Sequence, residues 1–175
     1  MIDPTRFVSA NFTDNFPQLE EEAVAELENL LFSRLLEQGQ VTVGEEVLEF
    51  AGRTNFKLRV KRPNRSVWSI PLKQLRDTLR QVLREGPQIL DQEPFVASRG
   101  GRTTTTSEGL RLLLLSIPPE EYQSRSFIGN EVEHGVYGVG KIVRINDSGN
   151  VEIEFPEKCV LLKPQFFRLK LEPNG

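Results

Sequence analysis

The spacing of the hydrophobic residues changes along this 175-residue chain, and that change restricts the folds open to it. Between residues 17 and 38 they recur every three or four positions, which predicts an amphipathic helix capped by Asn15 and stopped by Gly39. Its apolar positions are Leu19, Ala23, Leu27, Leu30, Leu31 and Leu35. From Val41 onward the spacing becomes typical of β-strands. The chain is therefore expected to belong to the α+β class.

Three short strands are predicted to follow the first helix, over residues 41–50, 54–62 and 66–70. The first two form a hairpin that turns near Gly52, with a bulge at Gly44. In the second strand apolar and cationic side chains alternate, so that one face is apolar and the other is cationic. We expect these strands to form a small antiparallel sheet.

Two further helices are predicted after this sheet. Pro71 opens the first, which ends at Gly86, and the second is a very apolar helix over residues 109–117 that stops before Pro118. Its leucines either pack inside the chain or reach a partner subunit. The intervening residues predict a loop, and the arginines, glycines and threonines of residues 99–106 within it are interpreted either as a phosphate clamp or as a plain linker.

Short strands separated by tight turns fill the C-terminal part of the chain. Val151, Ile153 and Phe155 alternate with two glutamates, which is typical of a half-buried antiparallel strand. Five such strands in under fifty residues predict a small β-barrel. The expected organisation is an α+β domain over residues 1–120, a linker over 121–126 and a barrel domain over 127–175.

One motif in this part resembles a known family. Val132, Glu133 and His134 are followed by Tyr137, Gly138, Val139 and Gly140, and then by the alternating strand described above. The pattern resembles the C-terminal Tudor/SH3-like domain of UvrD/PcrA-type helicases and, more distantly, the RNA-polymerase-interacting domain of CarD-type transcription factors. The resemblance covers residues 127–172 and implies an SH3-like (Tudor-like) β-barrel that binds protein, often RNA polymerase.

Three aromatic residues of the expected barrel are candidates for a protein interface: Tyr137, Phe166 and Phe167. Packing in the core is the alternative for each of them. His134 is expected to have a structural role, because no nucleophile lies beside it in the sequence. Cys159 lies in a run interpreted as an alternating β-strand and is expected to be a small buried hydrophobic residue.

Charge is strongly segregated, although the net charge of the chain is only −3. Residues 1–50 hold eleven acids and two bases, whereas residues 51–84 hold ten bases and one acid. The second strand and the second helix carry a cationic stripe that predicts contact with DNA or RNA phosphates. The stripe consists of Lys57, Arg59, Lys61, Arg62, Arg65, Lys73, Arg76, Arg80 and Arg84. Trp68 would add base stacking if it were exposed.

The alternative for this stripe is neutralisation by acids of the chain itself. Glu45, Glu46 and Glu49 precede it on the neighbouring strand, and the first helix is acidic. In that case the bases would form ion pairs within the chain and would not contact nucleic acid.

These patterns favour a non-enzymatic adaptor. Its barrel is expected to bind RNA polymerase or a DNA-repair or defence complex, while the cationic stripe contacts nucleic acid. The alternative is a structural or regulatory protein-interaction subunit that binds no nucleic acid. An enzyme is disfavoured because no paired catalytic residues or phosphate loop are recognisable, and no metal or small-molecule cofactor is expected. Without a run of about 20 apolar residues or a signal-peptide pattern, we expect a cytoplasmic protein.

Overall fold

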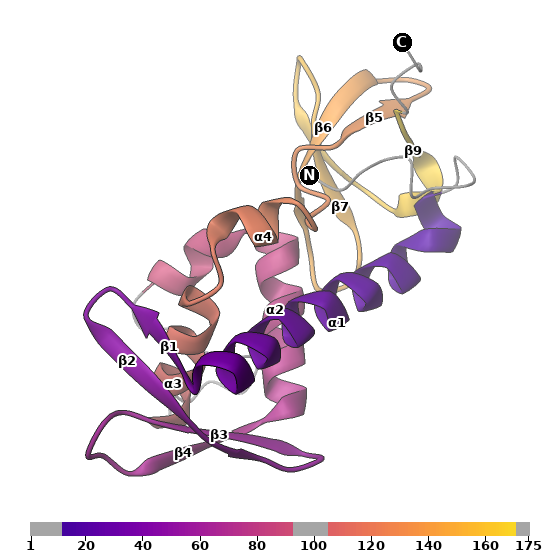
Figure 1. Cartoon of the computed structure of the whole chain (residues 1–175). Coiled ribbons are helices and arrows are strands. Elements are labelled where there is room, and N and C mark those ends of the chain that lie inside the picture. The colour runs from indigo at the N-terminus through magenta and orange to yellow at the C-terminus, as the bar shows by residue number, and fades with distance from the viewer. Residues whose placement is uncertain (1–11, 93–104, 171–175) are drawn as a thin grey trace.

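A computed structural model describes residues 12–92 and 105–170, which form helices and two antiparallel sheets (Figure 1). The predicted α+β class is confirmed. The elements up to the second helix are α1 (Phe12–Gln38), β1 (Gln40–Val43), β2 (Glu46–Arg53), β3 (Lys57–Lys61), β4 (Val67–Pro71) and α2 (Leu72–Glu85). They are followed by η2 (Pro87–Asp91), α3 (Thr105–Leu115), α4 (Pro119–Gln123), β5 (Glu131–His134), β6 (Gly138–Ile145), β7 (Val151–Glu154), β8 (Cys159–Leu162), η3 (Pro164–Phe166) and β9 (Arg168–Leu169).

The first helix, α1, begins earlier than predicted. Because it starts at Phe12, Asn15 and Pro17 lie inside the helix and do not mark its beginning. Pro17 is the sixth residue of α1, so the helix lacks one intrahelical hydrogen bond there, to the carbonyl four residues earlier. The predicted apolar face is buried apart from the partly exposed Leu30, and the helix stops before Gly39, whose φ of 70° is left-handed.

The first sheet has the strand order β1-β2-β3-β4, and its hairpins differ from the prediction. Gly44 lies in a two-residue turn between the paired residues Val43 and Glu46, so the expected single strand over 41–50 is two strands. Its φ of 57° suits such a turn, which requires positive φ angles. The bulge occurs between Phe50 and Gly52, so its predicted position at Gly44 is wrong.

Helices α2 and α3 complete the first hydrophobic cluster. The predicted stripe of α2 is buried, and α3 packs against β4, β1 and β2. Leu110, Leu112, Leu113 and Leu114 are all buried, so the leucine run of α3 packs inside the chain. The only glycine of α3, Gly109, faces the ring of Trp68 so closely that an added Cβ would lie 2.7 Å from it.

The segment between the two predicted domains contains a helix that the sequence interpretation missed. In α4, Tyr122 is buried and its hydroxyl donates a hydrogen bond to the carbonyl oxygen of Leu114 at 2.7 Å. Ser126, also within the expected linker, is buried and donates to the carbonyl oxygen of Leu83 at 2.7 Å. Residues 121–126 are therefore packed against the preceding helices.

The second sheet has the order β8-β7-β6-β5-β9, and all its strand pairs are antiparallel. Its last strand in the chain, β9, returns to pair with its first, β5. Among the described residues no ladder joins β8 to β9, so the sheet is open and the predicted closed barrel is not observed. Cys159 is exposed, contrary to expectation, because Val160 and Leu162 are the residues of β8 that turn inward.

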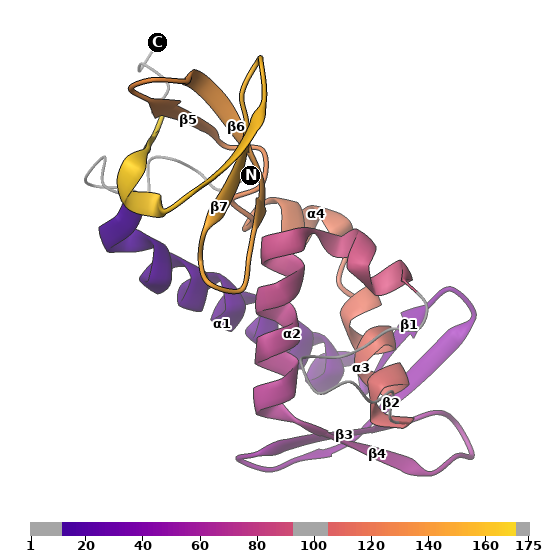
Figure 2. The same cartoon turned by 180° about the vertical axis from the view of Figure 1, so that it is seen from behind.

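One helix contributes to both hydrophobic clusters. Leu19 of α1 belongs to the cluster of the second sheet, whereas Ala23 to Leu35 of the same helix belong to the first cluster. Figures 1 and 2 show α1 running beside α2 from the second sheet towards the first. Arg84 at the end of α2 donates a hydrogen bond to the carbonyl oxygen of Asn146 at 3.2 Å. The second sheet is thus attached through both helices.

Candidate functional site

Most of the predicted cationic stripe is paired with acids of the same chain. Five of its nine residues form ion pairs: Lys61 with Glu49, Arg62 with Glu46, Arg76 with Glu28, Arg80 with Glu20, Glu21 and Asp77, and Arg84 with Glu20. Three of these five bases, on α2, are paired chiefly with α1. The acidic helix and the basic helix lie side by side with their charges facing each other.

Two of the contacts between these helices are bidentate. Arg76 donates from Nε and Nη2 to the carboxylate of Glu28 at 2.7 and 2.9 Å. Arg84 does the same to Glu20, with both distances at 2.7 Å. Glu20 and Glu28 are both buried, and a buried carboxylate requires such partners. The hydrogen bond to Glu28 raises the pKa of Arg76.

Arg80 lies between these two pairs and is held by three carboxylates. Burial lowers its pKa, but the hydrogen bonds and charges of Glu21, Glu20 and Asp77 together outweigh that effect, so that its pKa is raised. Asp77 and Glu20 lie 3.0 and 3.4 Å from its guanidinium. The three arginines of the stripe on α2 are therefore fixed in an internal network, as the alternative interpretation expects.

Besides the paired Arg76, four residues of the stripe are exposed, namely Lys57, Arg59, Arg65 and Lys73. No ion pair with another described residue engages these side chains. Trp68, the expected stacking residue, is only half exposed, packs against α3 and carries the guanidinium of Arg62 5.2 Å above its ring. Because Gly109 and Arg62 both lie against its ring, Trp68 is not the exposed stacking residue that the sequence interpretation considers. Of the phosphate clamp considered for residues 99–106, residues 99–104 lie outside the described ranges.

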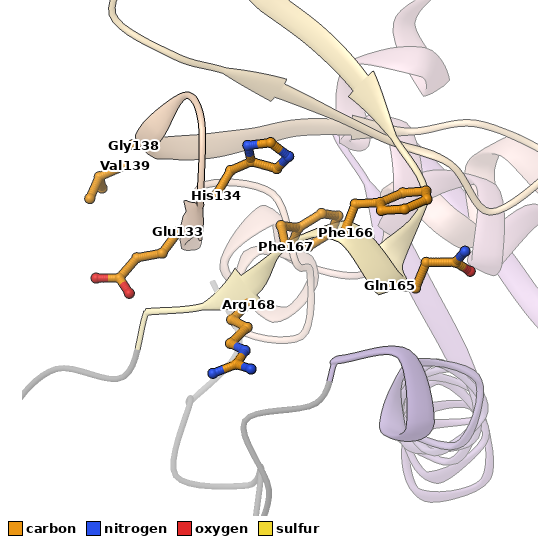
Figure 3. Close-up of a pocket in the computed structure, with 9 residues that line it drawn as sticks. Glu133, His134, Gly138, Val139, Gln165, Phe166, Phe167 and Arg168 are labelled. Carbon is orange, nitrogen blue, oxygen red and sulfur yellow. The ribbon is translucent and has the colours of Figure 1, made fainter.

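A surface pocket lies on the second sheet and is called here the β5/β9 pocket (Figure 3). It has a volume of about 560 Å³ and is lined by Glu133, His134, Gly135, Gly138, Val139, Gln165, Phe166, Phe167 and Arg168. Val139, Glu133 and Arg168 are opposite one another on β6, β5 and β9, so they form a row across three strands. All three are exposed, and no ion pair between described residues joins Glu133 to Arg168. The row offers a partner one apolar and two oppositely charged contacts.

The three aromatic residues predicted for a protein interface occupy different environments. Phe166 is 55% exposed and lines the pocket. Phe167 is only 4% exposed and belongs to the hydrophobic cluster, so it is chiefly a core residue. Phe166 is the last residue of η3 and Phe167 is the extended residue that follows it, so the two side chains point in different directions. Tyr137 is half buried, and its ring centroid lies 5.2 Å from that of Phe155.

His134 stabilises the turn between β5 and β6. Its Nδ1 accepts hydrogen bonds from the backbone N–H groups of Val136 and Tyr137 at 3.1 and 3.3 Å. Its ring also stacks on that of Tyr137, with the centroids 4.6 Å apart. These contacts agree with the structural role that the sequence predicts for it.

The sequence interpretation missed the polar part of the pocket and one exposed aromatic residue. Glu133, Val139 and Arg168 gave no signal because only strand pairing brings them together. Phe56, in the turn between β2 and β3, is 79% exposed. The sequence places Phe56 inside the predicted strand 54–62, in phase with Leu58 and Val60, and so predicts burial; this is wrong because β3 begins only at Lys57 and Phe56 lies in the turn before it.

No group of three or more His, Cys, Asp or Glu residues within the described ranges could hold a metal ion. None of the helices described has the length and apolar character needed to cross a membrane. Comparisons with protein-family models, with curated proteins and with solved structures find no match to this chain.

Proposed function

We propose that the chain is a non-enzymatic adaptor that binds another protein through the β5/β9 pocket. The observation that carries this proposal is Phe166, an aromatic side chain that is more than half exposed at the rim of a pocket containing a carboxylate and a guanidinium. Exposed aromatic and arginine side chains are the residue types most enriched at protein interfaces.

The strand order of the second sheet supports an SH3-like module. Because β9 pairs with β5, the last strand of this part lies beside its first, as closure of a barrel requires. The 3-10 turn η3 leads directly into β9 and sets Phe166 and Arg168 on the same pocket. In the resembled helicase and transcription-factor domains, the corresponding module binds protein, which suggests RNA polymerase or a DNA-repair or defence complex as the partner.

The row of charges defines the chemistry of the partner segment. An apolar side chain would pack on Phe166 and Val139, with a basic group placed beside Glu133 and an acidic group beside Arg168. Reversing the pocket's two charges should therefore weaken binding, because each reversed residue would meet a group of its own sign.

Two exposed phenylalanines allow a matched experiment. The whole chain, its Phe166→Ala variant and its Phe56→Ala variant are immobilised and tested for capture of purified RNA polymerase and of proteins from cell extract. We expect Phe166→Ala to weaken capture of the specific partner at least tenfold, about 1.4 kcal/mol, while Phe56→Ala retains it. Both side chains are exposed, so neither truncation should unfold the chain.

Two charge-reversal variants test the charged part of the pocket separately from Phe166. Glu133→Arg and Arg168→Glu should each fail to capture the partner whose capture Phe166→Ala weakens. Equal capture by the wild type and Phe166→Ala, or a partner lost only in Phe56→Ala, would exclude the β5/β9 pocket as the binding site.

A further inference from the structure

A second surface, away from the β5/β9 pocket, surrounds the turn between β2 and β3. Thr54 holds this turn, because its Oγ1 accepts hydrogen bonds from the N–H groups of Phe56 and Lys57 at 3.3 and 3.1 Å. The N–H of Thr54 in turn donates to the carbonyl oxygen of Lys57 at 2.9 Å. The turn is thus held by the side chain and backbone of Thr54, while the ring of Phe56 is left 79% exposed.

The start of α2 lies beside the same turn. The N–H of Leu72 donates to the carbonyl oxygen of Phe56 at 2.8 Å, which brings Lys73, the next residue, close to Phe56. Lys57 is opposite Pro71 in the pairing of β3 with β4. Two chain segments therefore each bring a lysine close to Phe56 along the backbone.

Lys57 and Arg59 point away from the hydrophobic cluster. Along β3 they alternate with the buried Leu58 and Val60, so both lie on the outer face of the first sheet. Both are exposed, and no ion pair within the described ranges engages either side chain or that of Lys73. We call Phe56, Lys57, Arg59 and Lys73 the β3 patch.

We infer that the β3 patch binds single-stranded nucleic acid, with the three cations contacting phosphates and Phe56 stacking on a base. This function goes beyond protein binding and uses a different surface. A positively charged face combined with an exposed aromatic ring is the arrangement by which proteins bind single strands without sequence preference. The internal pairing of Arg76, Arg80 and Arg84 removes the α2 part of the stripe from this interaction and restricts it to β3 and the start of α2.

The geometry of the patch favours a nucleic-acid strand over a lipid surface. Cations spaced two residues apart on one strand follow a linear polyanion, and a single ring matches one unstacked base. A membrane-surface segment would instead present an amphipathic helix with a continuous apolar face. The patch lies on a sheet, and Phe56 is its only large apolar side chain.

The experiment measures fluorescence anisotropy of a dye-labelled oligothymidylate of about 15 nucleotides with the whole chain. We expect a dissociation constant on the order of 10 to 100 µM at moderate salt. The slope of log affinity against log salt concentration should be about −2, because three phosphate contacts are made. Phe56→Ala should weaken binding about tenfold at an unchanged slope, because it removes stacking and no charge. Arg59→Ala should make the slope shallower by about 0.7.

Matched controls separate this surface from the rest of the molecule. Lys141→Ala removes an exposed lysine on β6, and Phe166→Ala removes the exposed phenylalanine of the β5/β9 pocket; both should bind the oligonucleotide like the wild type. The inference is overturned if the wild type does not bind, if Phe56→Ala binds equally well, or if Lys141→Ala reduces the slope as much as Arg59→Ala. Binding to phosphatidylserine vesicles without binding to the oligonucleotide would likewise overturn it.

Discussion

At the scale of single residues, Gly140 is the position where the second sheet leaves no room for a side chain. A Cβ added there would lie 2.7 Å from Ile153 Cγ2 and from Phe155 Cδ1, and 2.8 Å from the carbonyl oxygen of Glu154. Because one of these contacts is backbone, rotation of a side chain cannot relieve all of them. We expect Gly140→Ala to lower the free energy of unfolding by about 1 to 3 kcal/mol.

Gly135 provides the control for this prediction. A Cβ added to Gly135 would meet nothing within 4 Å, and its φ is not left-handed. Gly135→Ala should change the free energy of unfolding by no more than about 1 kcal/mol, with stabilisation possible because alanine restricts the unfolded chain. Urea denaturation of the two variants checks the pair, and equal destabilisation would contradict the steric explanation.

Tyr122 gives a pH-dependent prediction. Burial raises the pKa of its phenol above the usual value of about 10. Above that pH the unfolded chain loses the phenol proton while the folded chain keeps it, so the unfolded state binds fewer protons. The stability that Tyr122 contributes is therefore present below about pH 10 and falls at higher pH by up to about 1.4 kcal/mol per pH unit.

Tyr122→Phe isolates this contribution. At neutral pH the variant should lose about 1 kcal/mol, since it lacks the hydrogen bond to Leu114 whereas the Leu114 carbonyl keeps the N–H of Ile117 as a donor. The difference in unfolding free energy between wild type and variant should shrink as the pH rises from 8 to about 11. A difference that stays constant over that range would mean that the phenol titrates alike in both states.

Adjacent residues also define what a sequence can predict at this scale. Phe166 and Phe167 have the same side chain, yet one is exposed and the other is in the core. Cys159 belongs to a run of four apolar residues, so the sequence does not show which of them face the core. The strand register decides which side chains turn inward. Such choices depend on the partner strand, which local sequence does not specify.

At the scale of elements, α1 and α2 share a hydrophobic cluster and also a network of partly buried charges, and Glu20 is the centre of that network. Its carboxylate accepts two hydrogen bonds from Arg84 and lies 3.4 Å from Arg80, while its side chain is 7% exposed. Glu20→Gln would remove the buried carboxylate that faces Arg84 and Arg80. We expect a loss of about 2 to 4 kcal/mol in unfolding free energy, somewhat below the value for a fully buried pair because Arg84 is 17% exposed.

Glu22→Gln is the matched control on the same helix. Glu22 is exposed, and its recorded contact is a hydrogen bond from Gln18 at 3.0 Å. Its substitution should change stability by less than about 0.5 kcal/mol. Thermal denaturation of both variants tests the network, and a similar small change in each would show that the buried pairs contribute little.

The helices were the most predictable elements because their apolar period is local. The range of α2 and the end of α1 follow from leucine spacing and from Gly86 and Gly39, whereas the start of α1 at Phe12 was not predicted. Helix α4 was missed because Pro118 and Pro119 were interpreted only as helix breakers, although proline is also favoured at the first position of a helix. The pairs between Glu28 and Arg76 and between Glu20 and Arg84 join residues 48 and 64 positions apart, so only the packing of the helices could assign them.

At the scale of the whole molecule, α1 couples the two hydrophobic clusters, and Leu19 allows this coupling to be measured. Leu19 packs in the cluster of the second sheet, whereas the fluorescent reporter Trp68 packs against the first. Leu19→Ala should lower stability by about 2 to 4 kcal/mol. If the clusters unfold together, the transition observed through Trp68 shifts by the same amount as the transition observed by circular dichroism.

Leu36→Ala tests whether the effect comes from the cluster and not from the helix itself. Leu36 lies on the same helix but is 64% exposed, so its truncation should change stability by less than about 0.5 kcal/mol. A Trp68 transition that stays in place while circular dichroism develops a separate earlier phase in Leu19→Ala would mean that the second sheet unfolds independently. Coincident shifts would instead mean that a partner bound at the β5/β9 pocket stabilises the first sheet as well, because binding to a cooperative native state raises the stability of all its parts.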